Sequence, residues 1–209
     1  APVPVLEMLE PAMARRPVNP SFRGAYVFDR IENERLARYA AAYLLQASPP
    51  APASVGTQLQ KDLEIVRLRL FECREPRERD VWTHSLLNVA RATNPFLPPR
   101  EAAALWARAL GSPCAGSLTS FQRDWIELAA AVASRDGARM GELSGRLLSA
   151  QADLSREARE YLLVAGMTGL LSAGNRAGAL ALWQRGEGAL LAGPRPLHRL
   201  LRCQASPED

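Results

Sequence analysis

Lysine, histidine, cysteine and aromatic residues are all scarce in this chain of 209 residues. Lys61 is the only lysine among 26 basic residues, and aromatic residues make up 6% of the chain. A nucleic-acid-binding surface ordinarily uses lysine as well as arginine, so a net charge of +4 carried mostly by arginine argues against a nucleic-acid partner. The arginine bias is instead typical of a high-GC bacterial genome. No run of about 18 apolar residues occurs, so we expect no direct membrane insertion.

The few cysteines and histidines limit the possible metal and disulfide chemistry. Two histidines and three scattered cysteines offer no zinc-like ligand spacing, so we predict no metal site and no other cofactor. Three cysteines cannot form a closed disulfide framework. We expect Cys73, at the end of an apolar helix, to be a small buried hydrophobic residue. A Cys114–Cys203 bridge stays open as an alternative in an oxidising compartment.

Motifs for catalysis are also missing. The chain contains no Gly-x-Ser-x-Gly, no phosphate-binding glycine loop, no His-Glu-x-x-His and no Cys-x-x-Cys. His84 and His198 are isolated, and the carboxylate pair of Glu127 and Glu142 is of a kind that any helical protein offers. Trp82, Trp106, Trp125 and Trp183 fall at core spacing, so we expect them to pack rather than to stack on a ligand. We predict that the protein is not an enzyme.

The residues that are abundant indicate helices. Alanine and leucine dominate and β-branched residues are few, and apolar residues recur with helical periodicity along most of the chain. The predicted fold class is all-α, with about nine to ten helices stacked as antiparallel hairpins. The helices are expected to begin near Asp29, Thr57, Trp82, Pro98, Ser117 or Thr119, Met140, Ser155, Asn175 and Leu197. The helix from Ser155 is apolar almost all round, so we place it in the middle of the stack.

Proline content and chain ends suggest the domain organisation. We predict a Pro-rich arm or linker over 1–28, a helical-repeat domain over 29–204 and a frayed tail over 205–209. The chain opens at Ala1 without an initiator methionine, which indicates a processed protein or a piece of a longer one. On this ground we favour a periplasmic or exported protein over a cytoplasmic one.

Two patterns in the sequence recur at related spacings. Gly137 and Gly174 lie 37 positions apart at two helix breaks, and Gly174 is expected to hold a left-handed turn. The pattern Ala-Leu-Trp-x-Arg stands at 104–108 and again at 181–185, 77 positions apart. Successive hairpins would then pair the helices that begin near Trp82 and Pro98, Thr119 and Met140, and Ser155 and Asn175.

This repeat resembles a tetratricopeptide-like α-solenoid over about residues 78–190, with its best match at 160–191. There Gly174 stands at the turn, Ala179 at the small-residue position of the second helix and Trp183 at its large apolar position. Met167 and Leu170 depart from the pattern, no proline closes the unit, and spacings of 37 to 40 exceed the family's period. The resemblance implies a superhelix with a surface for partner binding.

The candidate binding residues lie in one arginine-rich segment, 67–80. Four arginines there could hold an anionic or polypeptide partner: Arg67, Arg74, Arg77 and Arg79. Acidic residues alternate with them, which is also typical of a solvated, salt-bridged surface. Both interpretations stay open at this point.

The sequence thus favours a non-catalytic interaction or scaffolding module that binds a polypeptide or a neighbouring domain. Two alternatives remain. One is an accessory, substrate-positioning domain of a larger exported or membrane-tethered bacterial enzyme, and the other is an all-α protein that binds a small ligand between its hairpins.

Overall fold

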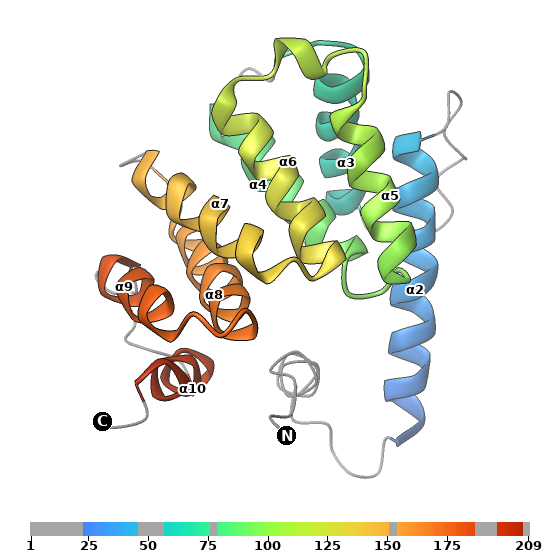
Figure 1. Ribbon diagram of the computed structural model, residues 1–209. Coiled ribbons are helices and arrows are strands. Elements are labelled where there is room, and N and C mark those ends of the chain that lie inside the picture. The colour runs from blue at the N-terminus through green and yellow to red at the C-terminus, as the bar shows by residue number, and fades with distance from the viewer. Residues whose placement is uncertain (1–22, 46–56, 76–78, 151–153, 187–195, 207–209) are drawn as a thin grey trace. The chain divides into compact units, whose positions relative to one another are not determined.

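The computed structural model describes residues 23–45, 57–75, 79–150, 154–186 and 196–206. Within these ranges the regular elements are all helical, which confirms the predicted all-α class (Figure 1). The elements are α2 (Arg23–Leu45), α3 (Thr57–Phe71), α4 (Arg79–Thr93), α5 (Pro99–Leu110), the 3-10 helix η2 (Ala115–Ser117), α6 (Ser120–Ser134), α7 (Gly137–Ala150), α8 (Arg156–Ser172), α9 (Arg176–Gly186) and α10 (Pro196–Ala205). None of the described helices is long and apolar enough to cross a bilayer.

Local sequence signals set several helix ends. Pro99 occupies the first turn of α5, where its missing N–H costs no helical hydrogen bond. The Ser155 hydroxyl accepts from the Ala158 N–H at 3.2 Å and caps α8. Thr119 and Gln122 cap α6 reciprocally, because each side chain accepts a hydrogen bond from the other's backbone N–H. Of the two caps predicted for this helix, Thr119 is the one that forms these bonds.

Helix α2 begins earlier than predicted. The sequence indicated an arm over 1–28 and a helix from Asp29, whereas Arg23 is already helical. Residues 23–28 contain no proline, and all of them except Gly24 are compatible with a helix. The rest of the predicted arm, residues 1–22, lies outside the described residues, as do the final three residues of the predicted tail.

The described helices form two compact units. The first unit runs from Gly24 to Ser134 and contains α2 to α6. Within it α3 packs mainly on α4 and α5 packs mainly on α6. Its largest fully buried side chains include three tryptophans and one arginine: Trp82, Trp106, Trp125 and Arg69. All four predicted core tryptophans are buried, the fourth being Trp183 of the second unit.

The helix pairing of the first unit differs from the predicted hairpins. The repeat pattern paired α4 with α5, but the buried face of α5 is covered mainly by α6. The connector between α4 and α5 explains this arrangement, because its residue Asn94 forms hydrogen bonds to both α5 and α6. Its amide donates to the Ala129 carbonyl of α6 at 3.0 Å, and its oxygen accepts from Trp106 Nε1 of α5 at 2.6 Å. The predicted pair of α6 and α7 spans the boundary between the two units.

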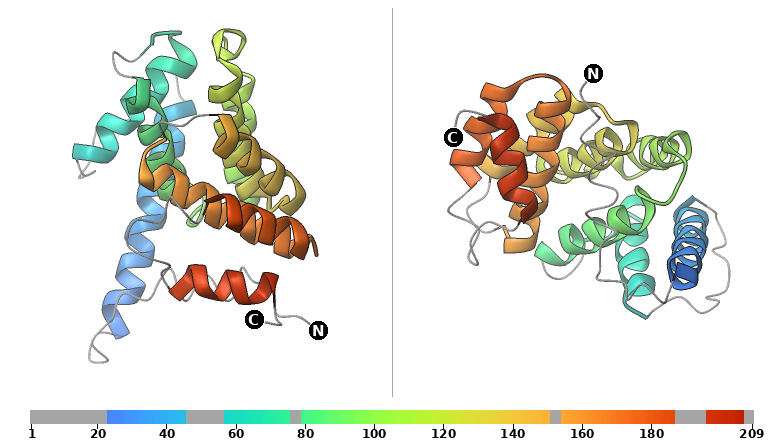
Figure 2. Two further views of the ribbon diagram at one scale, coloured as in Figure 1. Left: turned by 90° about the vertical axis from the view of Figure 1, so that its left-hand side faces the viewer. Right: turned by 90° about the horizontal axis from the view of Figure 1, so that it is seen from below.

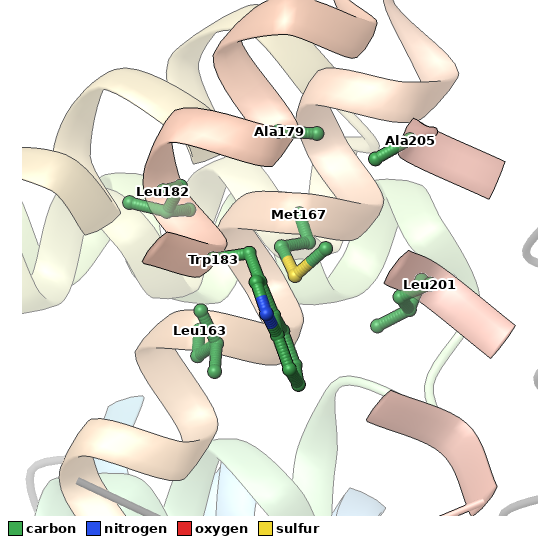
Figure 3. Close-up of a cluster of buried hydrophobic side chains, with 7 residues drawn as sticks. All are labelled: Leu163, Met167, Ala179, Leu182, Trp183, Leu201 and Ala205. Carbon is green, nitrogen blue, oxygen red and sulfur yellow. The ribbon is translucent and has the colours of Figure 1, made fainter. Parts of the chain in front are cut away.

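The second unit is built around α8 (Figure 2). Helix α8 packs on α7, α9 and α10, and α10 also packs on α9. One buried cluster joins three of these helices (Figure 3); its members are Leu163, Met167, Ala179, Leu182, Trp183, Leu201 and Ala205. The prediction that the nearly all-apolar helix from Ser155 is covered on more than one side is therefore confirmed.

Glycine permits the close approach of α7 and α8. A Cβ atom built at Gly169 would lie 2.6 Å from the Gly137 carbonyl oxygen and 2.6 Å from Met140 Cβ. Such distances are too short for real atoms, so neither helix could keep this position with a side chain there. A Cβ at Gly166 would likewise lie 2.6 Å from Ser144 Cβ. The two glycines that α8 needs, Gly166 and Gly169, thus lie before and after Met167 in sequence. Met167 itself packs in the cluster of Figure 3.

The turn between α8 and α9 has the expected left-handed glycine. Gly174 has φ +76°, its N–H donates to the Leu171 carbonyl at 3.0 Å, and the Asn175 N–H donates to the Leu170 carbonyl at 2.8 Å. These two bonds are those of a Schellman motif, which satisfies the last carbonyls of α8. The Asn175 side chain then caps α9 by accepting from the Gly178 N–H at 2.8 Å.

The corresponding turn before α7 has a different residue in the left-handed position. Arg135 has φ +58° and is followed by Asp136. The Asp136 carboxylate accepts a hydrogen bond from the Arg139 N–H at 3.1 Å and so caps α7. The equivalent residues of the two turns are therefore Arg135 and Gly174, 39 positions apart. The interpretation of Gly137 and Gly174 as equivalent break glycines was wrong. Gly137 belongs to the first turn of α7, where its lack of a side chain admits α8.

Candidate functional site

Arg67, the first of the predicted binding arginines, is engaged with α2. Its Nη1 donates to the Tyr43 carbonyl at 2.9 Å, and its guanidinium carbon lies 5.9 Å from the centre of the Tyr43 ring. This is a cation–π contact combined with a hydrogen bond to the backbone. Burial raises the pKa of the Tyr43 phenol, and the charge of Glu64 raises it further. Arg67 therefore ties α3 to α2.

The other predicted arginines are not gathered around Arg67 by any described contact. Arg74 is 72% exposed and lies 3.7 Å from Glu72, an ion pair of the solvated kind that the alternating charges indicated. Arg77 lies outside the described residues. Arg79 is the first residue of α4, but its side chain lies outside the described part. Binding of an anionic partner by these four arginines stays a prediction.

Arg69, which no sequence pattern marked as a binding residue, has the most extensive described contacts of this segment. Its side chain is 2% exposed, and Nη2 lies 2.8 Å from the Ser117 carbonyl, 2.9 Å from Gln122 Oε1 and 2.7 Å from Glu75 Oε1. Nη1 donates to the Ser117 hydroxyl at 3.1 Å. A buried guanidinium needs such partners because an unpaired charge is costly to remove from water.

A disulfide lies next to this arginine in the chain. Cys73 and Cys114 are bonded, with their Cα atoms 5.0 Å apart and a separation of 41 positions in sequence. The expectation that Cys73 is a free buried residue and the alternative Cys114–Cys203 pairing were both wrong. Cys73 follows the end of α3, where a left-handed backbone (φ +55°) belongs to a bend away from the helix axis. Cys203 is exposed and unbonded on α10.

The arginine and the disulfide together fix the segment between α5 and α6, residues 111–119. The Ser117 hydroxyl donates to the Cys114 carbonyl at 2.8 Å, and Arg123 Nη2 donates to the Ala115 carbonyl at 2.7 Å. Every polar group named here is directed at the protein's own backbone or side chains. We therefore interpret the Arg69 junction, defined as Arg69, Cys73, Cys114, Ser117 and Gln122, as a structural element and not as a binding site.

A faint sequence signal existed for this junction. Arg69 lies three residues after buried Val66 and directly before buried Leu70, so it falls on the apolar face of α3. Cys73 follows four residues later, two residues after the end of α3. A charged residue on a core face calls for a partner, but the partner's position 48 residues away could not be read from the sequence.

No group of three or more metal-ligating side chains occurs within the described ranges. His84 is exposed on α4, Glu127 is half-buried on α6, and Glu142 pairs with Arg139 at 2.7 Å and with Arg146 at 3.3 Å. The prediction that the protein is not an enzyme stays a prediction.

The two repeated segments on α5 and α9 each expose an arginine. The two Ala-Leu-Trp-x-Arg segments have the same burial pattern: Leu105 and Trp106 of α5 are 1% and 0% exposed, and Leu182 and Trp183 of α9 are 3% and 2% exposed. The other three residues of each segment are exposed. Each segment thus exposes alanine or glutamine and one arginine, with its leucine and tryptophan buried.

Comparison with protein-family models, with curated proteins and with solved structures finds no match to this chain. The resemblance to tetratricopeptide-like repeats therefore stays a prediction.

Proposed function

We propose that this protein is a non-catalytic interaction module that binds a polypeptide on an exposed helical surface. The observation that carries the proposal is the shared burial pattern of α5 and α9. Their large apolar residues are used for packing, while short side chains and arginine face outward. A helix with short exposed side chains lets a partner approach closely, and arginine is enriched at protein interfaces.

The helical hairpins support the same proposal. α3 with α4, α5 with α6 and α7 with α8 each form a closely packed pair. We propose that these pairs are tetratricopeptide-like hairpins, each of which offers an outer helical surface for binding within its own unit.

An affinity experiment with the full chain tests this function. The purified protein is immobilised and crosslinked to a lysate of its native host, and each captured polypeptide is then purified and titrated by calorimetry. A partner that saturates at a fixed stoichiometry supports an interaction module. Captured polypeptides that never saturate, together with a metabolite that raises the melting temperature in a ligand screen, would overturn the proposal in favour of small-ligand binding.

The disulfide favours a second candidate function, that of an accessory domain of an exported enzyme. Stable disulfides are typical of oxidising compartments outside the cytosol, so Cys73–Cys114 supports a periplasmic or exported location. Thiol alkylation in intact host cells tests the location. Alkylation of Cys203 alone would support a periplasmic or exported location. Alkylation of all three cysteines would exclude it.

A further inference from the structure

Two separate ties hold the end of α3 against the segment between α5 and α6, residues 111–119. One is the buried Arg69 guanidinium, which donates to the Ser117 carbonyl at 2.8 Å and to the Ser117 hydroxyl at 3.1 Å. The other is the disulfide between Cys73 and Cys114. Because both ties start near the end of α3 and reach the same segment, the disulfide is not the only attachment of residues 111–119 to α3.

The two halves of the disulfide differ in exposure. Cys73 is exposed, whereas Cys114 is only 1% exposed. The residues around Cys114 in the segment, Ser112 and Ala115, are buried as well. A thiolate attacks a disulfide sulfur in line with the S–S bond, and access decides which of the two sulfurs is attacked. An external thiolate therefore has a route to the bond from the Cys73 side, while the Cys114 side is covered.

The backbone at Cys73 places this residue outside the helix. Its φ of +55° lies in the left-handed region and turns the chain out of α3, which ends at Phe71. The Glu72 N–H donates to the Leu68 carbonyl at 3.2 Å, and the Arg74 N–H donates to the same carbonyl at 3.1 Å. These two bonds close the end of α3 and define the position of the exposed bend, residues 72–75.

The charges beside Cys73 are balanced. Arg69 Nη2 lies 2.7 Å from Glu75 Oε1, and Arg74 Nε lies 3.7 Å from Glu72 Oε2. Each arginine thus has a neighbouring glutamate, so these groups neither attract nor repel an anionic thiolate strongly. Access, and not charge, decides which sulfur an external thiolate attacks.

We propose that the Cys73–Cys114 bond is a redox switch, which an external dithiol opens by attack on Cys73. One thiolate of the dithiol bonds to Cys73 Sγ, and the electron pair of the S–S bond leaves with Cys114 Sγ, which takes up a proton. The second thiolate of the dithiol then displaces Cys73 Sγ from this mixed disulfide, and Cys73 takes up a proton in turn. The dithiol is oxidised to a disulfide, and the two cysteines are reduced to thiols. This switch goes beyond the proposed polypeptide binding and does not depend on it.

The Arg69 tie keeps the reduced chain folded. A disulfide stabilises mainly by restricting the unfolded chain, so its opening leaves the contacts of the folded state in place. Arg69 still donates to the Ser117 carbonyl and to Gln122 Oε1 after the bond has opened. Reduction therefore releases the exposed bend, residues 72–75, while residues 111–119 stay attached to α3.

Adduct mapping tests the direction of attack. The full chain with Cys203→Ser is used, because the exposed thiol of Cys203 would also react. It is treated briefly with reduced glutathione, a monothiol, and free thiols are then alkylated and located by mass spectrometry. Glutathione is expected on Cys73 and the alkyl group on Cys114, with the opposite arrangement at least about tenfold rarer. In guanidinium chloride, where both sulfurs are accessible, the two arrangements should occur in similar amounts.

Amide hydrogen exchange, followed by NMR, tests what the opening releases. Reduction of the same chain by dithiothreitol, a dithiol, should speed exchange of the Arg74 amide by about tenfold and change exchange over residues 111–119 by less than about threefold. Reoxidation should restore the slow exchange. The matched control carries Cys73→Ser and Cys114→Ala besides Cys203→Ser, and its Arg74 amide should exchange at the fast rate with or without dithiothreitol.

Three results would overturn the switch. Equal adducts on the two cysteines of the folded chain, or adducts that form only in guanidinium chloride, would mean that thiols do not reach the bond through Cys73. Unchanged exchange of the Arg74 amide after reduction would mean that the bend is not released. Exchange over residues 111–119 that rises as much as that of Arg74 would mean that Arg69 does not hold the segment.

Discussion

The Arg69 guanidinium in α3 donates to the Ser117 carbonyl at 2.8 Å, across 48 residues of sequence. This bond is one of several that the same buried side chain makes to the segment before α6. Burial of an arginine requires this degree of pairing, and in return the segment between α5 and α6 has one fixed position against α3.

Replacement of Arg69 by methionine should lower the free energy of unfolding by about 3 kcal/mol. The methionine fills part of the space but leaves the Ser117 carbonyl and Gln122 Oε1 without this donor. Denaturant unfolding monitored by tryptophan fluorescence measures the change. The control is Arg74→Met, at a side chain that is 72% exposed, where the change should stay within about 0.5 kcal/mol. Equal effects at the two positions would contradict the structural role of Arg69.

Removal of the disulfide should also destabilise the first unit. Cys73→Ser together with Cys114→Ala frees a loop closed across 41 residues, and the loop-entropy estimate for this length is about 4 kcal/mol. The unfolding midpoint of this variant is compared with that of Cys203→Ser, which removes the exposed free thiol and should leave the midpoint unchanged. A midpoint that does not respond to reduction of the unaltered chain would speak against the bond.

Gly174→Val should lower the stability by about 1 kcal/mol or more, because a β-branched side chain is strained at φ +76°. Gly145 in α7 is the matched control, since nothing lies within 4 Å of a Cβ built there. Gly145→Ala should raise the stability by up to about 1 kcal/mol, as expected inside a helix. Thermal unfolding separates the two signs, and a neutral Gly174→Val would mean that the turn is not left-handed.

Gly169→Ala tests the close approach of α7 and α8. The added methyl group would meet the Gly137 carbonyl at 2.6 Å, and backbone atoms cannot move aside as a flexible side chain can. We expect a loss of about 1 to 3 kcal/mol, read from chemical denaturation. A loss no greater than that of an alanine placed at Gly116, where no atom lies within 4 Å, would disprove the tight crossing.

The fold class and most helix positions could be predicted because they follow from local patterns. Prolines, caps and apolar periodicity mark the ends of α5, α6 and α8 in the sequence itself. Partner choice between helices could not be predicted in the same way. The side chain of Asn94 bonds to both α5 and α6, and this depends on tertiary positions that no periodicity encodes.

The equivalence of repeated turns was misjudged for a related reason. A glycine in a sequence can serve a left-handed turn or a close helix contact, and the two are indistinguishable without a structure. Gly174 serves the first purpose and Gly137 the second. The arginine-rich segment was noticed, but the sequence could not separate Arg69, which is buried, from Arg74, which is solvated.

The bond between Cys73 and Cys114 encloses the whole of α4 and α5 in a covalent ring. A protease that cuts once inside this ring separates no fragments, because both pieces stay joined through sulfur. The nicked protein should run as a single band on a non-reducing gel and as two bands after reduction. Cleavage elsewhere in the chain gives two bands under both conditions, so the ring keeps α4 and α5 attached only after a cut between Cys73 and Cys114.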